Sequence, residues 1–197
     1  MKLVETKIYS QLIMISDYVL LGLLWVIVSL PLITIIPASV AVLYVLKQWR
    51  NASTGQLLFH FYRGLKKYFF INLFMSGLTI SLYFTTNLLL QESSRSLMIS
   101  GYFVSIVYLM FLLSWIDHCR RSETLSIFAL FEKSALDVVL SFGGNVFCSF
   151  VIGIFTVLVF LFPPFIFLFS GAVWKIIDLI LARKSGGFYN ELSHLVK

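Results

Sequence analysis

One uncharged stretch, residues 18–46, limits what this chain can fold into. It runs for 29 residues without a charged side chain, and as one straight helix it would be about 43 Å long. The hydrocarbon core of a bilayer is about 30 Å thick, so the stretch is long for one pass and short for two. Pro31 and Pro37 each remove a backbone donor and disfavour a continuous helix. We therefore predict two helices separated by a break over residues 30–37, which includes Thr34. We expect the other passes to pack around this break, because broken backbone at membrane depth must be covered by protein or water.

Composition indicates that the rest of the chain is also membrane protein. The mean hydropathy is +0.94 and 12% of the residues are charged, whereas soluble domains carry about 25%. A length of 197 residues is enough for five or six passes without a separate soluble domain. We therefore predict an all-α, polytopic membrane protein in which residues 1–197 form a single integral membrane domain surrounded by the lipid bilayer.

The number of passes depends on whether the uncharged stretch crosses once or twice. Four further apolar runs can each span a bilayer: 69–90, 97–116, 146–162 and 165–182. With six passes, 14 of the 15 Lys and Arg residues lie on or near the cytoplasmic side, and Arg95 alone lies outside. With five passes, Lys2 and Lys7 also move outside. Both alternatives satisfy the positive-inside rule and place the C-terminus in the cytoplasm. Six passes, the favoured alternative, place the N-terminus there too.

Two basic segments, 47–67 and 117–133, connect these runs on the predicted cytoplasmic side. The first has an apolar helical face, which predicts an amphipathic helix on the membrane surface; the face consists of Leu57, Phe61, Leu65 and Tyr68. The basic residues of both segments are candidate contacts with a partner protein or with lipid headgroups: Arg50, Arg63, Lys66, Lys67, Arg120 and Arg121. Because such loops explain the net charge of +6, we predict no nucleic-acid partner.

The two basic segments, each with the pass that follows, resemble one another. When residues 47–90 are placed on residues 117–162, Arg50 falls on Arg120 and Phe61 falls on Phe131. The segments are either a weak internal repeat or two independent connectors, since any basic connector before a pass has this pattern.

The sequence contains no motif of a known catalytic centre, so we predict no enzymatic activity, cofactor or metal. Asp117, His118 and Cys119 are adjacent residues of types that can bind a metal ion. Neighbouring residues of a helix point in different directions, so we do not expect these three to share a metal ion. Lys175 and Asp178 are three residues apart in the last apolar run, and we interpret them as a mutually neutralised pair.

The residues around the break resemble those of a known family. Leu23-Leu24-Trp25, the segment from Ser29 to Ser39 and the run from Leu43 to Leu46 are similar to the pattern of the YesL-like bacterial membrane proteins, a domain of unknown function. Ile36 stands where that family usually has Gly, and Ser39 where it usually has Thr.

This resemblance implies a multi-pass protein of the bacterial cell membrane with no catalytic residues. YesL-like proteins are typically encoded beside carbohydrate ABC importers, which implies an accessory protein that binds the permease subunits of an oligosaccharide importer. We expect Ser76-Gly77 and Gly153 to allow a close approach between helices. The alternative is a small stand-alone transporter or channel whose path lies at the break, lined by Thr34 and Ser39.

Overall fold

The computed structural model describes residues 2–51, 56–91, 95–121 and 126–195, and these residues form helices without a strand. The sequence prediction of an all-α fold is confirmed. The elements, in chain order, are α1 Lys2–Ser29, the short 3₁₀ helix η1 Leu32–Thr34, α2 Ile35–Asn51, α3 Leu57–Gln91, α4 Arg95–Arg121, α5 Ile127–Leu140, α6 Phe142–Leu161 and α7 Phe165–Leu195.

Six segments of the described chain are long and apolar enough to cross a membrane. They are Gln11–Ser29, Leu32–Arg50, Leu57–Leu88, Arg95–Arg121, Phe142–Leu161 and Phe165–Arg183. The uncharged stretch at the start of the chain contributes the first two, as in the six-pass alternative. It can do so because α1 already begins at Lys2 and α2 continues to Asn51, so both helices gain length outside the stretch.

The break between α1 and α2 is shorter than the sequence predicts. Helix α1 ends at Ser29, Pro31 is extended at the start of η1 (φ −74°, ψ 114°), and α2 begins at Ile35. Pro37 lies in the first turn of α2. The backbone N–H groups of a first turn have no acceptor within the helix, so a proline there removes no hydrogen bond. The break therefore spans residues 30–34, and Pro37 is not part of it.

The other passes do not enclose the break, although α3 packs against η1. Leu30 and Leu32 are 75% and 71% exposed. The break forms the turn between two passes, at their common end. The Thr34 hydroxyl lies within hydrogen-bond distance of two acceptors there, 2.5 Å from the Val28 carbonyl and 2.6 Å from that of Pro31.

Helix α2 lies at the centre of the molecule. In its apolar segment 61% of the residues are buried, against 11–33% in the other five. Seven apolar side chains of α2 are fully buried: Ala38, Val40, Ala41, Val42, Leu43, Val45 and Leu46. The helices that enclose α2 are α1, α3, α4 and α7, all of which contact it. The outer helices instead expose their large apolar side chains, as expected for surfaces that face lipid.

Helices α1 and α7 cross at two glycines. A Cβ atom placed on Gly171 would lie 1.9 Å from the Tyr18 carbonyl oxygen, and one on Gly22 would lie 2.5 Å from the Gly171 amide nitrogen. The two backbones are therefore in direct contact, as is typical of small residues in membrane helices. A Cβ on Gly77 or Gly153 would meet nothing within 4 Å. Among the described residues, no helix of this chain therefore makes a close approach at these two glycines.

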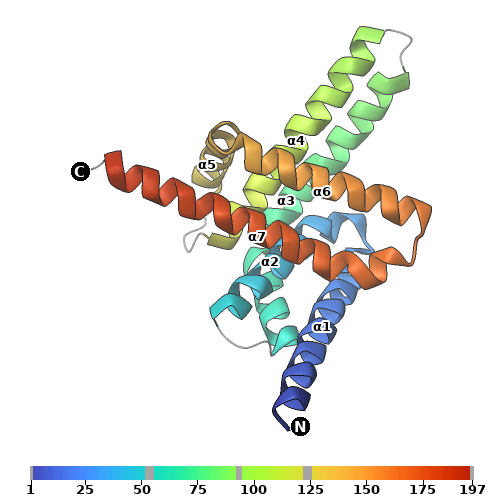
Figure 1. The fold of residues 1–197 in the computed structure, drawn as a ribbon. Helices are drawn as coiled ribbons and strands as arrows, with labels where there is room; N and C mark the ends of the chain where they lie inside the picture. The colour runs from blue at the N-terminus through green and yellow to red at the C-terminus, as the bar shows by residue number, and fades with distance from the viewer. Residues whose placement is uncertain (1, 52–55, 92–94, 122–125, 196–197) are drawn as a thin grey trace.

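The first basic connector does not form a separate surface helix. Its amphipathic part and the following pass form one helix, α3, of 35 residues, in which Phe61 and Tyr68 are buried. The second connector does form a separate helix, α5, which ends at Leu140 before α6 begins at Phe142. Helices α3 and α5 start at the aligned positions Leu57 and Ile127, after which the two segments differ. In Figure 1 the α3–α4 hairpin projects from the bundle and the α6–α7 hairpin extends in another direction.

Candidate functional site

A chain of five charged side chains joins the ends of α2 and α4 to the middle of α7. Its members alternate in sign and come from α2, α7 and α4: Arg50, Asp178, Arg120, Asp117 and Arg121. We call this group the ion-pair chain. The two middle contacts belong to Arg120, which bonds to Asp178 on one side and to Asp117 on the other. Because α2, α4 and α7 are separate passes, the ion-pair chain fixes the ends of α2 and α4 at the level of Asp178 in α7.

Asp178 holds α7 against α2 and α4. Its side chain is fully buried. Arg50 donates from Nε to Asp178 Oδ2 at 3.0 Å and from Nη2 to the Asp178 carbonyl oxygen at 3.0 Å. Arg120 donates from Nη1 to Asp178 Oδ1. A carboxylate buried in this way is stable only because its oxygens accept charge-assisted hydrogen bonds.

Asp117 completes the ion-pair chain within α4. Arg120 Nη2 donates to Asp117 Oδ1 at 2.7 Å, and Arg121 Nε donates to the same oxygen at 3.1 Å. Arg121 also reaches α7, where its Nη2 donates to the Leu181 carbonyl oxygen at 2.9 Å. The side chains of Arg120 and Asp117 are 3% and 2% exposed, whereas the terminal members Arg50 and Arg121 are 32% and 28% exposed.

The electrostatics favour arginines at these positions. Arg50 lies in the last turn of α2, and Arg120 and Arg121 lie in the last turn of α4. Each helix C-terminus carries roughly half a negative charge, which attracts cations. Lys47 adds a further cation, with Nζ 3.4 Å from the Arg120 carbonyl oxygen. The ion-pair chain therefore stabilises the arrangement of the helices; no nucleophile or free carboxylate is among its members.

Two expectations about these charges need correction. Lys175 does not pair with Asp178: its Nζ lies 5.3 Å from the centre of the Tyr18 ring, whereas Asp178 binds Arg50 and Arg120. Arg120 is not a surface contact, because it is buried in the ion-pair chain.

The structure places the remaining candidate contact residues on the outside of α3. Arg63, Lys66 and Lys67 are exposed, and Lys67 Nζ lies 5.1 Å from the centre of the Tyr68 ring. The six basic residues proposed as contacts therefore form two groups: three are available on α3, and three belong to the ion-pair chain. Thr54, which the sequence offers as a possible N-cap, and Thr124, which aligns with it, lie outside the described residues.

A buried asparagine, which sequence reasoning missed, joins α3 to α4. Asn72 is fully buried. Its Oδ1 accepts a hydrogen bond from Trp115 Nε1 at 3.0 Å, its Nδ2 donates to the Tyr68 carbonyl oxygen at 2.8 Å, and Cys119 Sγ lies 3.8 Å from Oδ1. An isolated Asn inside an apolar run is the sequence signal, because a polar side chain in a pass needs a partner on another helix.

A second polar contact joins α4, α5 and α6 at Asp137. Ser114 and Ser141 donate their hydroxyls to its carboxylate, and His118 Nε2 lies 3.9 Å from Oδ2. Asn145 Nδ2 donates to the Asp137 carbonyl oxygen at 3.3 Å.

The three adjacent residues 117–119 therefore contact three different partners. Asp117 binds arginines, His118 faces Asp137 and Cys119 faces Asn72. They do not converge, as the sequence predicts for neighbours on a helix. Within the described ranges no group of three His, Cys, Asp or Glu residues could hold a metal ion.

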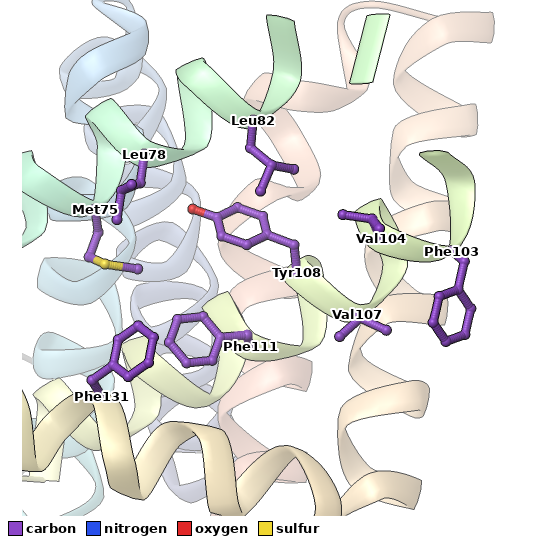
Figure 2. Close-up of a pocket in the computed structure, with 9 residues that line it drawn as sticks. All are labelled: Met75, Leu78, Leu82, Phe103, Val104, Val107, Tyr108, Phe111 and Phe131. Carbon is purple, nitrogen blue, oxygen red and sulfur yellow. The ribbon is translucent and has the colours of Figure 1, made fainter. Parts of the chain in front are cut away.

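An apolar groove of about 380 Å³ lies between α3, α4 and α5. Figure 2 shows its lining, with side chains of all three helices turned toward one another. The lining residues are Met75, Leu78, Leu82, Phe103, Val104, Val107, Tyr108, Phe111 and Phe131. Its polar group, the Tyr108 hydroxyl, is hydrogen-bonded to the Thr79 hydroxyl at 2.9 Å. The groove can therefore accept an apolar group and offers no charge for catalysis.

Of the comparisons with known proteins, one finds a match, and it covers the first part of the chain. No curated protein and no solved structure matches it. Residues 18–90 match the model of a family described as "Protein of unknown function, DUF624". The matched region contains most of the first pass, the break, α2 and nearly all of α3, and thus one member of the ion-pair chain, Arg50. Over residues 18–90 the chain is therefore similar to a family of unknown function.

Proposed function

We propose that this protein is a non-enzymatic accessory subunit of a bacterial carbohydrate import system. It would bind the permease subunits of an ABC importer for oligosaccharides within the cell membrane. The observation that carries the proposal is the sequence around the break, from Leu23 to Leu46, which resembles YesL-like proteins. Such proteins are typically encoded beside carbohydrate ABC importers.

The geometry supports a binding role in two ways. First, the buried charges described above are paired with one another, whereas a coupled ion needs a charged group that is available to bind it. Second, Gly77 on α3 and Gly153 on α6 leave open surface where no group of this chain lies within 4 Å of a Cβ position. Small residues on an outer face allow a helix of another subunit to approach closely.

The orientation follows from the basic residues. The ends of α2 and α4, the start of α3 and helix α5 lie on one side of the six passes. Arg95, at the start of α4, lies on the other. The positive-inside rule assigns the side with more Lys and Arg to the cytoplasm. We therefore propose that both termini face the bacterial cytoplasm.

The rival function is a stand-alone transporter or channel at the break. In the structure Leu30 and Leu32 are largely exposed, and the Thr34 hydroxyl lies next to the carbonyls of Val28 and Pro31. The Thr34 hydroxyl and the two carbonyl groups are therefore hydrogen-bond partners of one another at the end of the first two passes. A path would need them to face an enclosed cavity.

The test combines purification from native membranes with reconstitution. The tagged chain should recover importer permease subunits, and the chain alone in liposomes should take up no oligosaccharide. Gly77→Leu and Gly153→Leu should each fold normally, and at least one should reduce recovery of the permease. Ala135→Leu, on an exposed face of α5, is the matched control. Uptake by the chain alone would establish the rival function. Full recovery of the permease with both glycine variants would refute the proposed contacts at Gly77 and Gly153.

A further inference from the structure

The apolar groove between α3, α4 and α5 is open to the outside of the protein. Phe103, Val104 and Val107 line it and are 68%, 46% and 41% exposed, whereas Met75 is 1% exposed. The groove in Figure 2 therefore has a buried floor and an open outer edge. Because α3 and α4 are long and apolar enough to cross a membrane, this open edge faces the bilayer.

The groove lies in the half of the membrane that borders α5, since Phe131 of α5 is part of its lining. Along α4 the lining runs from Phe111 to Phe103, and the pass becomes polar at Asp117. At 1.5 Å per residue, Phe111 lies about 9 Å and Phe103 about 21 Å from Asp117 along the helix. One leaflet occupies about 15 Å of the hydrocarbon core. The groove therefore covers the depth at which the acyl chains of one leaflet lie.

The groove is wide enough for one hydrocarbon chain and too narrow for a helix. Its volume of about 380 Å³, spread over the roughly 12 Å between Phe103 and Phe111, gives a mean cross-section of about 30 Å². A helix 10 Å in diameter has a cross-section of about 80 Å². A hydrocarbon chain is narrower, because its carbon atoms contact their neighbours at about 4 Å. An acyl chain therefore fits lengthwise, whereas a partner helix could insert only side chains.

One face of α3 joins the groove to a cation. At 3.6 residues per turn, Lys67 points within about 20° of Leu78, a groove residue, whereas Lys66 points about 120° away from it. Lys67 is exposed and comes just before the apolar run 69–90, so it lies at the membrane surface, where lysines attract anionic headgroups. This face of α3 thus has the order of an anionic phospholipid, with charge at the surface and apolar groups below it.

We propose that the groove binds one acyl chain of an anionic phospholipid whose phosphate contacts Lys67. The groove surrounds the chain with more carbon atoms than a flat helix face can, which increases the dispersion attraction. The charge of Lys67 selects an anionic headgroup. The bound chain fills the space between three helices, next to the contact of Phe111 with Phe131, whose ring centres are 5.0 Å apart. It thereby holds α5 against the two passes.

The experiment is native mass spectrometry of the purified full chain, which measures the lipid that stays bound. The probes are phosphatidylglycerol and phosphatidylcholine with the same acyl chains, and inorganic phosphate as a competitor. A monomer should retain phosphatidylglycerol about fivefold better than phosphatidylcholine, and inorganic phosphate should not displace it. Equal retention of the two lipids, or displacement by inorganic phosphate, would overturn the proposal. A dimer free of lipid would assign the groove to a second copy of the chain.

Two tryptophan variants test whether the chain lies in the groove. Val107→Trp fills the groove from its exposed edge, and Val157→Trp makes the same change on α6, where Val157 is 58% exposed. Displacing about two methylene groups from contact should lower lipid retention about tenfold in Val107→Trp and leave the control unchanged. Equal retention in both variants would refute the groove as the site. If Val107→Trp kept its lipid and lost recovery of permease subunits, the groove would belong to a partner helix.

Two lysine variants test the headgroup contact without changing the groove. Both positions are exposed on α3, so both variants should fold, with the melting temperature as the check. Lys67→Gln should lose the preference for phosphatidylglycerol, and Lys66→Gln, which points away from the groove, should keep it. An equal loss in the two variants would reduce the contact to general surface charge and refute the role of Lys67.

Discussion

The crossing of α1 and α7 gives the sharpest test of the packing. In Gly171→Ala the new methyl group would lie 1.9 Å from the Tyr18 carbonyl oxygen and 2.8 Å from its carbon. Non-bonded heavy atoms prefer a separation of about 3.5 Å. The two helices must therefore move apart by roughly 1.5 Å at this point. Both obstacles are backbone atoms, so no side chain can rotate to make room.

The expected magnitude follows from two opposing terms. Overpacking of a well-packed interior costs about 1–3 kcal/mol, and rigid backbone favours the upper end of this range. Replacing Gly by Ala within a helix contributes about 0.5–1 kcal/mol of stability. Gly171→Ala should therefore lose about 1–2 kcal/mol of unfolding free energy. Gly153→Ala, where nothing lies within 4 Å of the Cβ position, keeps only the favourable term.

The assay is thermal unfolding of both variants in the same detergent, followed by tryptophan fluorescence. Two of the four tryptophans, Trp25 and Trp174, lie next to the crossing with ring centres 5.6 Å apart, so part of the emission reports on this contact. The melting temperature should fall by several degrees in Gly171→Ala and stay level or rise in Gly153→Ala. If the two variants were equally stable, the direct backbone contact between α1 and α7 would be refuted.

Three further predictions concern the charges, the topology and the break. Asp178→Asn leaves two arginines without their shared carboxylate and should cost about 3–5 kcal/mol in denaturant unfolding; a loss below about 1 kcal/mol would place the group in a wet, exposed site. Single cysteines at the exposed positions of Lys66 and Arg95 should react with an impermeant thiol reagent from opposite sides of the membrane, and labelling from one side would mean that α3 does not span. Pro31→Ala should lower stability by about 0.4–1 kcal/mol, because proline restricts the unfolded chain at a turn. Pro37→Ala loses the same restriction of the unfolded chain but gains the higher helix propensity of Ala in α2, so it should change stability little. An equal loss in both proline variants would contradict this distinction.

The positions of the passes could be predicted from the sequence because they depend on length and charge alone. The turn at Pro163-Pro164 lies between α6 and α7, as its double proline indicates. Helix lengths were predicted less well. The residues of 57–68 alternate polar and apolar faces like a surface helix, but no residue around Tyr68 stops a helix, so α3 continues into the membrane. The exposed face of such a helix can contact water at one end and lipid at the other.

The ion-pair chain could be predicted only in part. Asp117 with Arg120 and Arg121 has the spacing of helical neighbours, and those contacts are readable from the sequence. Asp178 has a plausible local partner in Lys175, yet it binds two arginines from other helices. Nothing in the local sequence distinguishes an arginine that will be buried from one that remains on the surface. The positive-inside rule treats Arg120 and Arg63 alike, although one is buried and the other is exposed.

The ion-pair chain also constrains the topology independently of hydropathy. Its members come from the ends of α2 and α4 and from α7, so these three sites must lie on one side of the membrane. An even number of passes must therefore separate them in the chain. Helices α3 and α4 supply two passes between the first pair, and α6 and α7 supply two between the second. If helix α5, with 14 residues, were also a pass, three passes would separate Arg120 from Asp178. The two residues would then lie on opposite sides of the membrane and could not bind each other. Its exposed apolar face must lie along the same membrane surface, next to the ends that the ion-pair chain holds together.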